Sequence, residues 1–375
     1  ARPENRPLIF GKLDERGQPL LSVSEELRPS RIMRVLATRL APFGLAIDVP
    51  RYWIEGPVSR DFHWLKRTPY LCSGCPHNTS TQLPEGSEAR LGIGCHALAA
   101  RMPDRATSGS VQMGGEGADW LGQMAFVATP HIFQNIGDGT FFHSGYLAIR
   151  QAIAANANIT YKVLYNDAVA MTGGQPVDGK LSVRQVVELV QSEGVREVVV
   201  VADDPGRYKA RDSLPEGVKV YHRDSLDSVQ RRLRELRGVS VLVFDQVCAT
   251  EARRRRKRLP APKVQSRLVI NEQVCEGCGD CQTKSNCLSV VPVETEFGRK
   301  RSIENDSCNL DQSCVKGFCP SFVTVTGTPA PARRQQLPAE QVLQRAGALA
   351  APELPGFGRT FELLLTGVGG TGVVT

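Results

Sequence analysis

Seven of the eleven cysteines lie between residues 275 and 319, and their spacing is typical of an iron–sulfur module. Three thiolates set two residues apart can bind one cluster, and a distant cysteine followed by proline completes the ligand set. In two-cluster ferredoxin folds the fourth cysteine of each half binds the other cluster. The pattern therefore assigns a first [4Fe–4S] cluster to Cys275, Cys278, Cys281 and Cys319. It assigns a second cluster to Cys287, Cys308, Asp311 and Cys314.

Asp311 is included because it stands where a complete second half would have a thiolate, midway between Cys308 and Cys314. An oxygen ligand should hold its iron more weakly than a thiolate does. The second site could therefore be a [4Fe–4S] cluster with an aspartate ligand, a [3Fe–4S] cluster that has lost that iron, or vacant. Its three cysteines could also be a remnant that binds nothing.

A second constellation suits a magnesium ion and a diphosphate. The triplet Gly137-Asp138-Gly139 is followed, after 26 residues, by Asn166. The residues between them predict a strand, a crossover helix and a second parallel strand. Neighbouring parallel strands end at one edge of the sheet, where open α/β sheets bind ligands. Carboxylate and amide oxygens at that edge suit Mg²⁺, and the glycines let backbone N–H groups approach a diphosphate.

The elements that position these residues alternate along residues 68–250. Short β-branched runs alternate there with helical patterns, which predicts an α/β fold with a mostly parallel sheet. The clearest elements are strands over 131–136, 159–165, 196–202 and 239–244 and helices over 145–155 and 182–192. Two helices are expected outside this region, over 29–40 and 338–349. The cysteine-rich segment is expected to form a small α+β domain with a ferredoxin-like fold.

Composition and cysteine use narrow the class of protein. A hydrophobic content of 41% and a charged content of 23% are ordinary for a globular protein. No apolar run reaches the length of a membrane span, and no signal peptide opens the sequence, so no membrane partner is expected. The chain is too long for a secreted disulfide scaffold, and CxxCxxC spacing suits metal better than disulfides. A reducing cytoplasm is therefore the expected compartment.

The net charge of +7 is a local patch. Residues 253–258 carry six positive charges, which leaves +1 for the rest of the chain. A solvated linker or a docking patch for an acidic partner is favoured over nucleic-acid binding. Cys248 precedes this run without a partner close in sequence, and it is interpreted as an ordinary thiol.

Further segments resemble a known family. The Gly-Asp-Gly and Asn pattern resembles the thiamine-diphosphate motif, and residues 133–178 are similar to the C-terminal thiamine-binding domain of 2-oxoacid:ferredoxin oxidoreductases. Three segments stand where that family has cofactor-lining loops, namely Cys72-Ser-Gly-Cys75-Pro-His77, Gly92-Ile-Gly94-Cys95 and Met113-Gly-Gly-Glu116-Gly117. The likeness is strongest to the indolepyruvate ferredoxin oxidoreductases in their long fused bacterial form, and it covers essentially the whole chain.

This resemblance implies a set of site residues. It implies that the side chains of Asp138 and Asn166 and the carbonyl oxygen of Ala168 ligate Mg²⁺. Near the diphosphate or the rings of thiamine diphosphate it places Gly137, Gly139, His77, Gly94 and Cys95. The loop over 168–175 would close over the site. Thiamine sites lie between two domains, and the activating glutamate is expected outside this chain.

Two groups near this site have competing structural interpretations. A zinc site is the alternative for Cys72, Cys75 and Cys95 with His77 and His96, since a CxxC pair and two histidines supply four ligands. A buried CxxC pair without any ligand role is a further alternative. Five aromatic residues could line an aryl pocket, although such residues more often belong to the core: Trp120, Phe126, Phe133, Phe141 and Phe142.

The resemblance also implies an activity, which is oxidative decarboxylation of an aryl 2-oxo acid, such as indolepyruvate, to an acyl-CoA. CoA would take the acyl group, and the electrons would leave through the iron–sulfur clusters to ferredoxin. A homo-oligomer is expected, and nucleic acid is not an expected partner. The alternative is a stand-alone iron–sulfur electron-transfer module with a non-catalytic α/β domain.

The expected domain order follows from these assignments. Residues 359–375 contain a glycine run after a strand-like stretch, and they are expected to begin a truncated gamma-type oxidoreductase domain. The chain is therefore expected to be an internal fragment of a longer polypeptide. The preceding parts are the end of an earlier domain or a linker over 1–60, the thiamine-binding domain over 61–250, a basic linker over 251–265, the iron–sulfur domain over 266–326 and a second linker over 327–358.

Overall fold

The computed structural model describes residues 10–23, 27–49, 69–171, 173–175, 179, 181–210, 213–258, 266–327, 338–347 and 349–350. It divides into two units, Ala1–Thr68 and Pro69–Thr375, and each is described by itself. The expected gamma-type segment over 359–375 and most of the second linker lie outside the described residues. Of the helices described, none is both long and apolar enough to cross a membrane.

The described part of the first unit contains one amphipathic helix, α1 (Pro29–Leu40), which continues into the 3-10 turn Ala41–Phe43. Proline opens the helix, where its missing N–H costs no hydrogen bond. Arg39, in the last turn, pairs with Glu15 at 2.7 Å and lies 4.2 Å from the ring centroid of Phe10. The helix predicted over 29–40 is confirmed at both ends.

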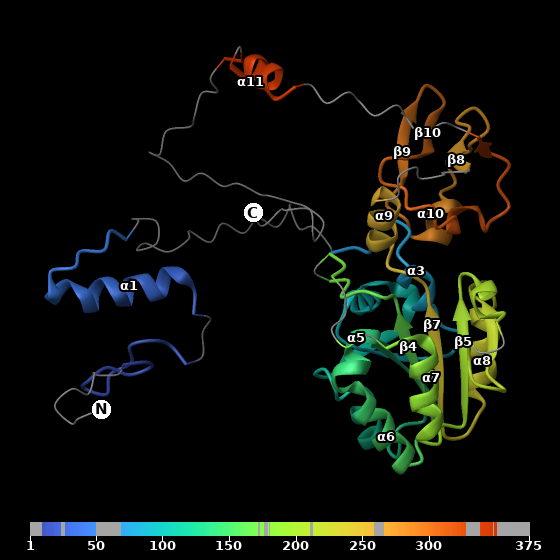
Figure 1. Ribbon diagram of the computed structural model, residues 1–375, viewed down its shortest axis with the longest axis horizontal. Helices are drawn as coiled ribbons and strands as arrows, with labels where there is room; N and C mark the ends of the chain where they lie inside the picture. Colours follow the sequence, from blue (N-terminus) through green and yellow to red (C-terminus); the bar gives the residue numbers. More distant parts are fainter. Residues whose placement is uncertain are drawn as a thin grey trace. The chain divides into compact units, whose positions relative to one another are not determined.

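A seven-stranded parallel sheet lies at the centre of the second unit, in the order β2-β1-β3-β4-β7-β5-β6. Figure 1 labels its neighbouring strands β4, β7 and β5. All six neighbouring pairs are parallel, which confirms the predicted α/β class. The strands are β1 (Ala89–Leu91), β2 (Thr107–Ser110), β3 (Ile132–Gly137), β4 (Ile159–Tyr165), β5 (Glu197–Ala202), β6 (Lys219–His222) and β7 (Val239–Asp245).

Helices cover both faces of this sheet. On one face α4, α6 and α7 pack against alternate strand residues such as Val163, and on the other face α8 packs against neighbours such as Leu164. This alternation is the period-two pattern of a strand buried on both sides. The helices of this region are α3 (His77–Ser80), α4 (Ala118–Gln123), α5 (Asp138–Thr140), α6 (Tyr146–Ala154), α7 (Val183–Ser192), α8 (Leu226–Arg234) and α9 (Ala249–Arg258).

Shorter helical segments connect these elements. A π-helical turn, Phe141–Gly145, joins α5 to α6, so the helix predicted over 145–155 continues an irregular segment. Ser182 and Gln185 form a capping box at the start of α7, which explains the boundary of the helix predicted there. The 3-10 segments are Cys95–Arg101, Pro103–Arg105, Pro205–Tyr208, Arg223–Ser225 and Ser313–Val315.

The central strand β4 carries a fully buried lysine. The ammonium group of Lys162 donates to the carbonyl oxygen of Gln82 at 3.1 Å, and the side-chain amide of Gln230 donates to the same oxygen at 3.1 Å. Burial, the largest cause, lowers the pKa of Lys162 to about 7, and the nearby charge of Arg105 acts in the same direction. The sheet therefore contains a charged group whose solvation is poor at neutral pH.

The cysteine-rich segment forms two antiparallel strand pairs. β8 (Ser266–Ile270) pairs with β11 (Phe322–Thr326), and β9 (Val290–Thr295) pairs with β10 (Gly298–Ile303). One short helix, α10 (Asp280–Ser285), lies between β8 and β9. The core of this domain consists of a few aliphatic residues and the cysteines themselves. The apolar core of this domain is therefore small. The last described helix, α11 (Ala339–Gly347), falls within the predicted 338–349.

Candidate functional site

The carboxyl ends of β3 and β4 bring Asp138 and Asn166 together. Gly137, the last residue of β3, is paired with Leu164 of β4, and each polar residue follows its strand. The Asp138 carboxylate accepts the backbone N–H of Asn166 at 3.0 Å. The two residues therefore meet at the sheet edge, as the predicted βαβ unit requires.

The Asp138 carboxylate organises the backbone of this edge. Oδ1 accepts the N–H of Gly139 at 2.9 Å, and Oδ2 accepts the N–H groups of Asn166 and Asp167 at 3.0 and 2.9 Å. Burial raises the pKa of Asp138, and these three hydrogen bonds counteract it by stabilising the charged form. Asp138 thus has a structural task in addition to the ligand role expected for it.

Oxygen donors for a cation gather in the turn after β4. Asn166 Oδ1 accepts the N–H of Ala168 at 3.2 Å, and its amide nitrogen lies 3.4 Å from His77 Nε2. Ala168 is buried in this turn. A Cβ at Gly139 would meet no atom within 4 Å, so the space beside this turn is open. These oxygens and this open space fit Mg²⁺ held together with phosphate oxygens.

Two buried histidines border the same edge. The pKa of His77 is lowered to about 3 and that of His96 to about 4, and burial is the largest cause of both shifts. Both rings are therefore neutral at physiological pH.

Gly94 has φ +151°, and a Cβ there would lie 2.9 Å from the His96 ring, while one at Gly137 would lie 3.7 Å from it. Among the residues described, none offers a hydrogen-bond partner to the buried His96 Nε2. An orphaned ring nitrogen between two glycine turns fits a bound polar ligand.

Four thiols line one cavity beside this edge. The cavity, about 410 Å³ counted with its mouth, is also lined by His77 and Asn166. Burial is the largest cause that raises the pKa of Cys95 to about 11, and burial also raises the pKa of Cys72 and Cys75. We call this cavity the first thiol pocket, and its thiols belong to Cys72, Cys75, Cys95 and Cys248.

Cys248, interpreted from the sequence as an ordinary thiol, lines the first thiol pocket together with the other three cysteines. Its backbone N–H donates to the carbonyl oxygen of Asn166 at 2.9 Å, because β7 lies next to β4 in the sheet. Cys248 therefore reaches the pocket from a third strand end. The strand over 239–244 was predicted from the sequence, but its position beside β4 was not. Only the order of the strands in the sheet places Cys248 at this cavity.

The zinc alternative receives no support from these positions. Within the described ranges, no three His, Cys, Asp or Glu side chains are grouped so as to hold a single metal ion. The cysteines of the first thiol pocket instead surround a cavity.

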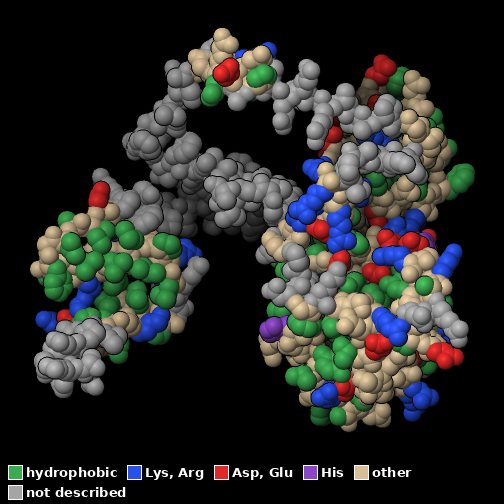
Figure 2. Space-filling model, viewed as in Figure 1, with side chains coloured by type: hydrophobic (Ala, Val, Ile, Leu, Met, Phe, Trp, Pro, Cys, Tyr) green, Lys and Arg blue, Asp and Glu red, His purple; other side chains and the backbone are tan. Residues whose placement is uncertain are grey.

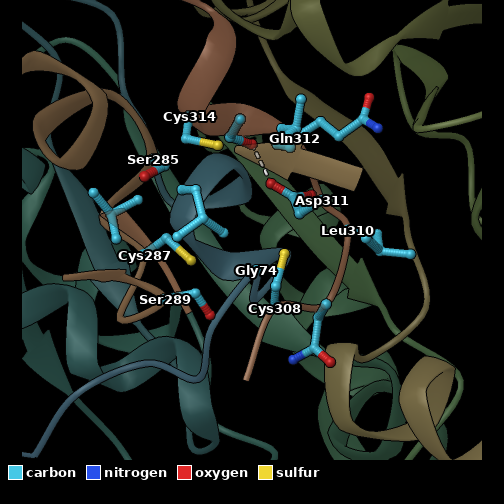
Figure 3. Close-up of a pocket in the computed structure, with 14 residues that line it drawn as sticks. Gly74, Ser285, Cys287, Ser289, Cys308, Leu310, Asp311, Gln312 and Cys314 are labelled. Atoms are coloured by element: carbon cyan, nitrogen blue, oxygen red, sulfur yellow. Dashed lines mark hydrogen bonds between the residues drawn. The ribbon is translucent and has the colours of Figure 1, made fainter. Parts of the chain in front are cut away.

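The cysteine-rich domain contains a second cavity with the expected ligands of the second cluster. About 420 Å³ in volume with its mouth, it is lined by Asp311 and by the three thiols of Cys287, Cys308 and Cys314, which we call the second thiol pocket (Figure 3). Figure 3 shows the sulfur atoms of Cys287 and Cys308 turned toward the middle of the cavity. Burial, its largest cause, raises the pKa of Cys314 to about 12.

The four cysteines expected to hold the first cluster lie in the same small domain. Cys275 and Cys281 are buried in its core, Cys278 is exposed and Cys319 is half-buried. Burial raises the pKa of Cys281, with smaller contributions from the neighbouring Cys319 and Cys275 thiols. Cys281 therefore lies near both Cys275 and Cys319.

The basic run predicted to be a linker forms helix α9, over which Lys and Arg side chains gather (Figure 2). Arg254 donates to the carbonyl oxygens of Gly173 and Gly174, in the loop expected to close over the site. Arg255 pairs with Asp167 at 2.7 Å. This side of α9 therefore holds the turn that follows β4.

The same helix also contacts the cysteine-rich domain. Arg253 donates to the carbonyl oxygen of Asp306, and Arg256 Nη2 lies 3.5 Å from Asn309 Oδ1. The side chains of four consecutive arginines therefore bond to other groups of the same chain, and their first role is structural. The expected docking patch for an acidic partner is left with Lys257 and Arg258, which are exposed.

Most of the aromatic candidates belong to the core. Trp120, Phe133 and Phe141 are buried, and the Trp120 indole donates to the carbonyl oxygen of Asn158 at 3.2 Å. Phe126 and Phe142 are 87% and 44% exposed. The structural interpretation therefore holds for the first three residues.

The loop over 113–117 contains a buried carboxylate whose role was not predicted. Glu116 is fully buried, and its Oε2 accepts the N–H of Gly114 at 2.7 Å. Burial raises the pKa of Glu116. The Glu116 carboxylate holds the turn of this glycine-rich loop. No pattern in the sequence predicted that this side chain would be buried inside the loop.

Known proteins resemble this chain over the same region. Residues 92–207 match the family described as Thiamine pyrophosphate enzyme, C-terminal TPP binding domain. Indolepyruvate oxidoreductase subunit IorA of Archaeoglobus fulgidus is 28% identical over 265 residues, which cover 68% of this chain and 39% of that protein. The subunit of the same name from Thermococcus kodakarensis is 29% identical over 252 residues, which cover 60% and 36%. The resemblance inferred from the motifs is thereby confirmed, and the chain spans about two fifths of these relatives.

A solved structure is also similar in part. 2-oxoglutarate:ferredoxin oxidoreductase from Magnetococcus marinus matches 49% of this chain and 66% of that chain, with 18% identity and a TM-score of 0.36. A likeness at this level does not extend to the site.

Proposed function

We propose that this chain, similar over most of its length to indolepyruvate oxidoreductase subunits, is the diphosphate-binding and electron-transfer part of a thiamine-dependent 2-oxoacid:ferredoxin oxidoreductase. Its substrate would be an aryl 2-oxo acid such as indolepyruvate, its product an acyl-CoA and its electron acceptor ferredoxin. One observation carries the proposal: Asn166 belongs both to the oxygen-rich turn with Asp138 and to the wall of the first thiol pocket. Redox centres held by those thiols would lie directly beside a cofactor held by that turn.

The donor set indicates which residues would hold the cofactor. The side chains of Asp138 and Asn166 and the carbonyl oxygen of Ala168 would bind Mg²⁺, and Gly137 and Gly139 would lie near the diphosphate. Thiamine diphosphate, when bound, supplies the electron sink for decarboxylation of a 2-oxo acid. The chain's own contribution is to position that group and to exclude water from it.

His77, Gly94 and Cys95 border the same space. Because its pKa is lowered to about 3, His77 is neutral and can orient the Asn166 amide without placing a positive charge near the magnesium ion. Neutral His96 has a free ring nitrogen among the described residues, with which it can bond a ligand group. These residues would thus bind and orient rather than exchange protons.

The two thiol pockets and the first-cluster cysteines would carry the electrons. Four thiolates around one cavity are the donor set of a [4Fe–4S] cluster, and the first thiol pocket provides four. In the cysteine-rich domain, which we propose to be ferredoxin-like, a further cluster would be held by Cys275, Cys278, Cys281 and Cys319. Burial has raised several of these thiol pKa values, so metal binding must displace protons that the empty site retains.

Cofactor binding to the full-length protein tests the proposal. Thiamine diphosphate with Mg²⁺ should raise the unfolding temperature of the metal-stripped protein, as expected for a ligand that binds the native state alone. Asp138→Asn should abolish this rise, and Asp203→Asn, an exposed change, should preserve it. Intact protein should also reduce a low-potential dye when indolepyruvate and CoA are both present.

Two results would contradict the proposal in different ways. If iron is bound but the cofactor does not stabilise the protein, the chain is an electron-transfer module with a non-catalytic α/β domain. If the cofactor binds and dye reduction follows an aliphatic 2-oxo acid instead, the aryl substrate is wrong and the chemistry stands.

A further inference from the structure

The two thiol pockets are separated by a single turn. Gly74 lines the second thiol pocket, and its neighbours Cys72 and Cys75 line the first. Across this turn Asn309 Nδ2, from the rim of the second thiol pocket, donates to the carbonyl oxygen of Ser73 at 2.7 Å. The Ser73–Gly74 turn is therefore a wall common to both cavities.

Gly74 allows this close approach. Its φ is +65°, a conformation that residues with a side chain rarely adopt. A Cβ at this position would lie 3.0 Å from Asp311 Cβ and 3.3 Å from Asn309 Cβ. Asp311 therefore lies directly against the turn between the two pockets.

The Asp311 carboxylate is already committed to bonds within the chain. Oδ1 accepts from Arg223 and, at 2.9 Å, from the side-chain amide of Gln246, while Oδ2 accepts from the Ser313 hydroxyl (dashed line at Asp311 in Figure 3). Arg223 Nη2 also donates to the backbone carbonyl oxygen of Asp311 at 2.6 Å. The carboxylate of Asp311 is thus turned to Arg223, Gln246 and Ser313, and Arg223 holds both its side chain and its backbone.

The partners of Asp311 come from the sheet. Arg223 follows β6 and Gln246 follows β7, so both stand at the carboxyl edge that carries the first thiol pocket. The side chains of Arg223 and Asp311 are 11% and 10% exposed, so this ion pair between the two domains is well shielded from solvent. By contrast, the neighbouring pair Lys316–Asp224 is 35% and 55% exposed.

We propose that Asp311 is a positioning residue that clasps the cysteine-rich domain to the sheet edge, and that it is not the fourth ligand of a second cluster. The second thiol pocket then offers three thiolates, and a cluster bound there would keep one metal position for an exchangeable ligand. The role of the clasp in electron transfer rests on the proposed function, because it sets the separation of two redox sites across the Ser73–Gly74 turn. The clasp itself depends only on the contacts described.

Four variants of the full-length protein, Asp311→Asn, Arg223→Met, their double variant and Lys316→Met, separate a clasp from a ligand. Amide exchange is measured over residues 72–76 and 308–314, and iron per chain is measured on the same anaerobic preparations. Asp311→Asn, Arg223→Met and the double variant should each accelerate amide exchange in both segments by about tenfold or more, because each removes a shielded ion pair. The double variant should add little to either single change, because both remove one interaction. Lys316→Met, at an exposed pair, should change exchange little.

Iron content decides between the two roles of Asp311. A clasp predicts wild-type iron in Asp311→Asn and in Arg223→Met alike. Iron loss in Asp311→Asn alone, with wild-type iron in Arg223→Met, would identify Asp311 as a ligand and overturn the proposal. Unchanged exchange in both single variants would also overturn it. If the wild-type protein itself binds no iron, the electron path fails, and the exchange data still decide whether the clasp exists.

Discussion

Arg254 Nη1 donates a hydrogen bond to the carbonyl oxygen of Gly174 at 2.5 Å, which ties helix α9 to the loop that follows the Asp138–Asn166 edge. The same guanidinium bonds the carbonyl oxygen of Gly173 and the carboxylate of Glu251. Within this loop the backbone closes on itself, with Val169 N–H donating to Gln175 at 2.8 Å. One arginine therefore restrains a loop expected to cover a cofactor.

Arg254→Met should loosen this loop and leave the fold intact. Removal of the guanidinium leaves the carbonyl oxygens of Gly173 and Gly174 without their donor, so the amides of Val169 and Gly174 should exchange about tenfold faster. Lys257→Met, on the exposed part of α9, is the matched control and should leave exchange unchanged. Equal exchange in the two variants would show that Arg254 does not restrain the loop.

Asp138→Ala should destabilise the protein even without any cofactor. Three backbone N–H groups lose their acceptor, and the free energy of unfolding should fall by about 3 kcal/mol. Asp138→Asn keeps one acceptor oxygen and should lose less. Urea unfolding of both variants measures the difference, with the exposed Asp227→Ala as the control. A fall no larger than that of Asp227→Ala would mean that the N–H groups find other acceptors.

Gly74→Ala should cost more than the same change at another glycine with a similar backbone. Gly86 has φ +71° and an empty surrounding, so Gly86→Ala should cost about 1 kcal/mol for conformation alone. Gly74→Ala adds a steric conflict with Asp311 and Asn309 and should cost about 2–3 kcal/mol. Comparing the thermal unfolding of Gly74→Ala and Gly86→Ala isolates the steric effect of the added methyl group at Gly74. If both substitutions lower the stability equally, the two domains accommodate that methyl group at no cost in free energy.

The buried Lys162 predicts a pH-dependent stability. Its folded pKa of about 7 lies below the ordinary 10.5, so between these values the unfolded chain binds more protons. The penalty for burying the charge is full below pH 7 and decreases as the pH rises. Relative to Lys162→Met, the wild type should therefore gain about 2 kcal/mol between pH 7 and pH 9.

At pH 7 the Lys162→Met variant should be the more stable protein, because Gln230 still donates to the Gln82 carbonyl oxygen. Denaturant unfolding of both proteins at the two pH values gives the comparison. A constant difference between them would mean that Lys162 does not titrate in this range.

The sequence predicted the regular parts of the fold well because local signals and burial agree there. The strand over 159–165 and the helix over 29–40 were predicted to the residue. The pairing of Asp138 with Asn166 also followed, since a βαβ unit leaves little choice of geometry.

Features that depend on strand order were not predictable. Cys248 joins the first thiol pocket only because β7 inserts between β4 and β5, an arrangement that no local pattern encodes. The arginines of α9 looked solvated because the acceptors of their hydrogen bonds include groups far away in the sequence. Asp311 matched a ligand by register, and its contact with Arg223 exists only in three dimensions.

Helix α9 also limits how the chain can be divided by engineering or by gene rearrangement. Its arginines bond to the loop after β4 on one side and to Asp306 and Asn309 on the other. A cut at the arginine run, where composition changes most sharply, would expose unbonded carbonyl groups on both products. If the cysteine-rich domain is swapped between related proteins, helix α9 and the residues that accept its hydrogen bonds should therefore be transferred together as one unit.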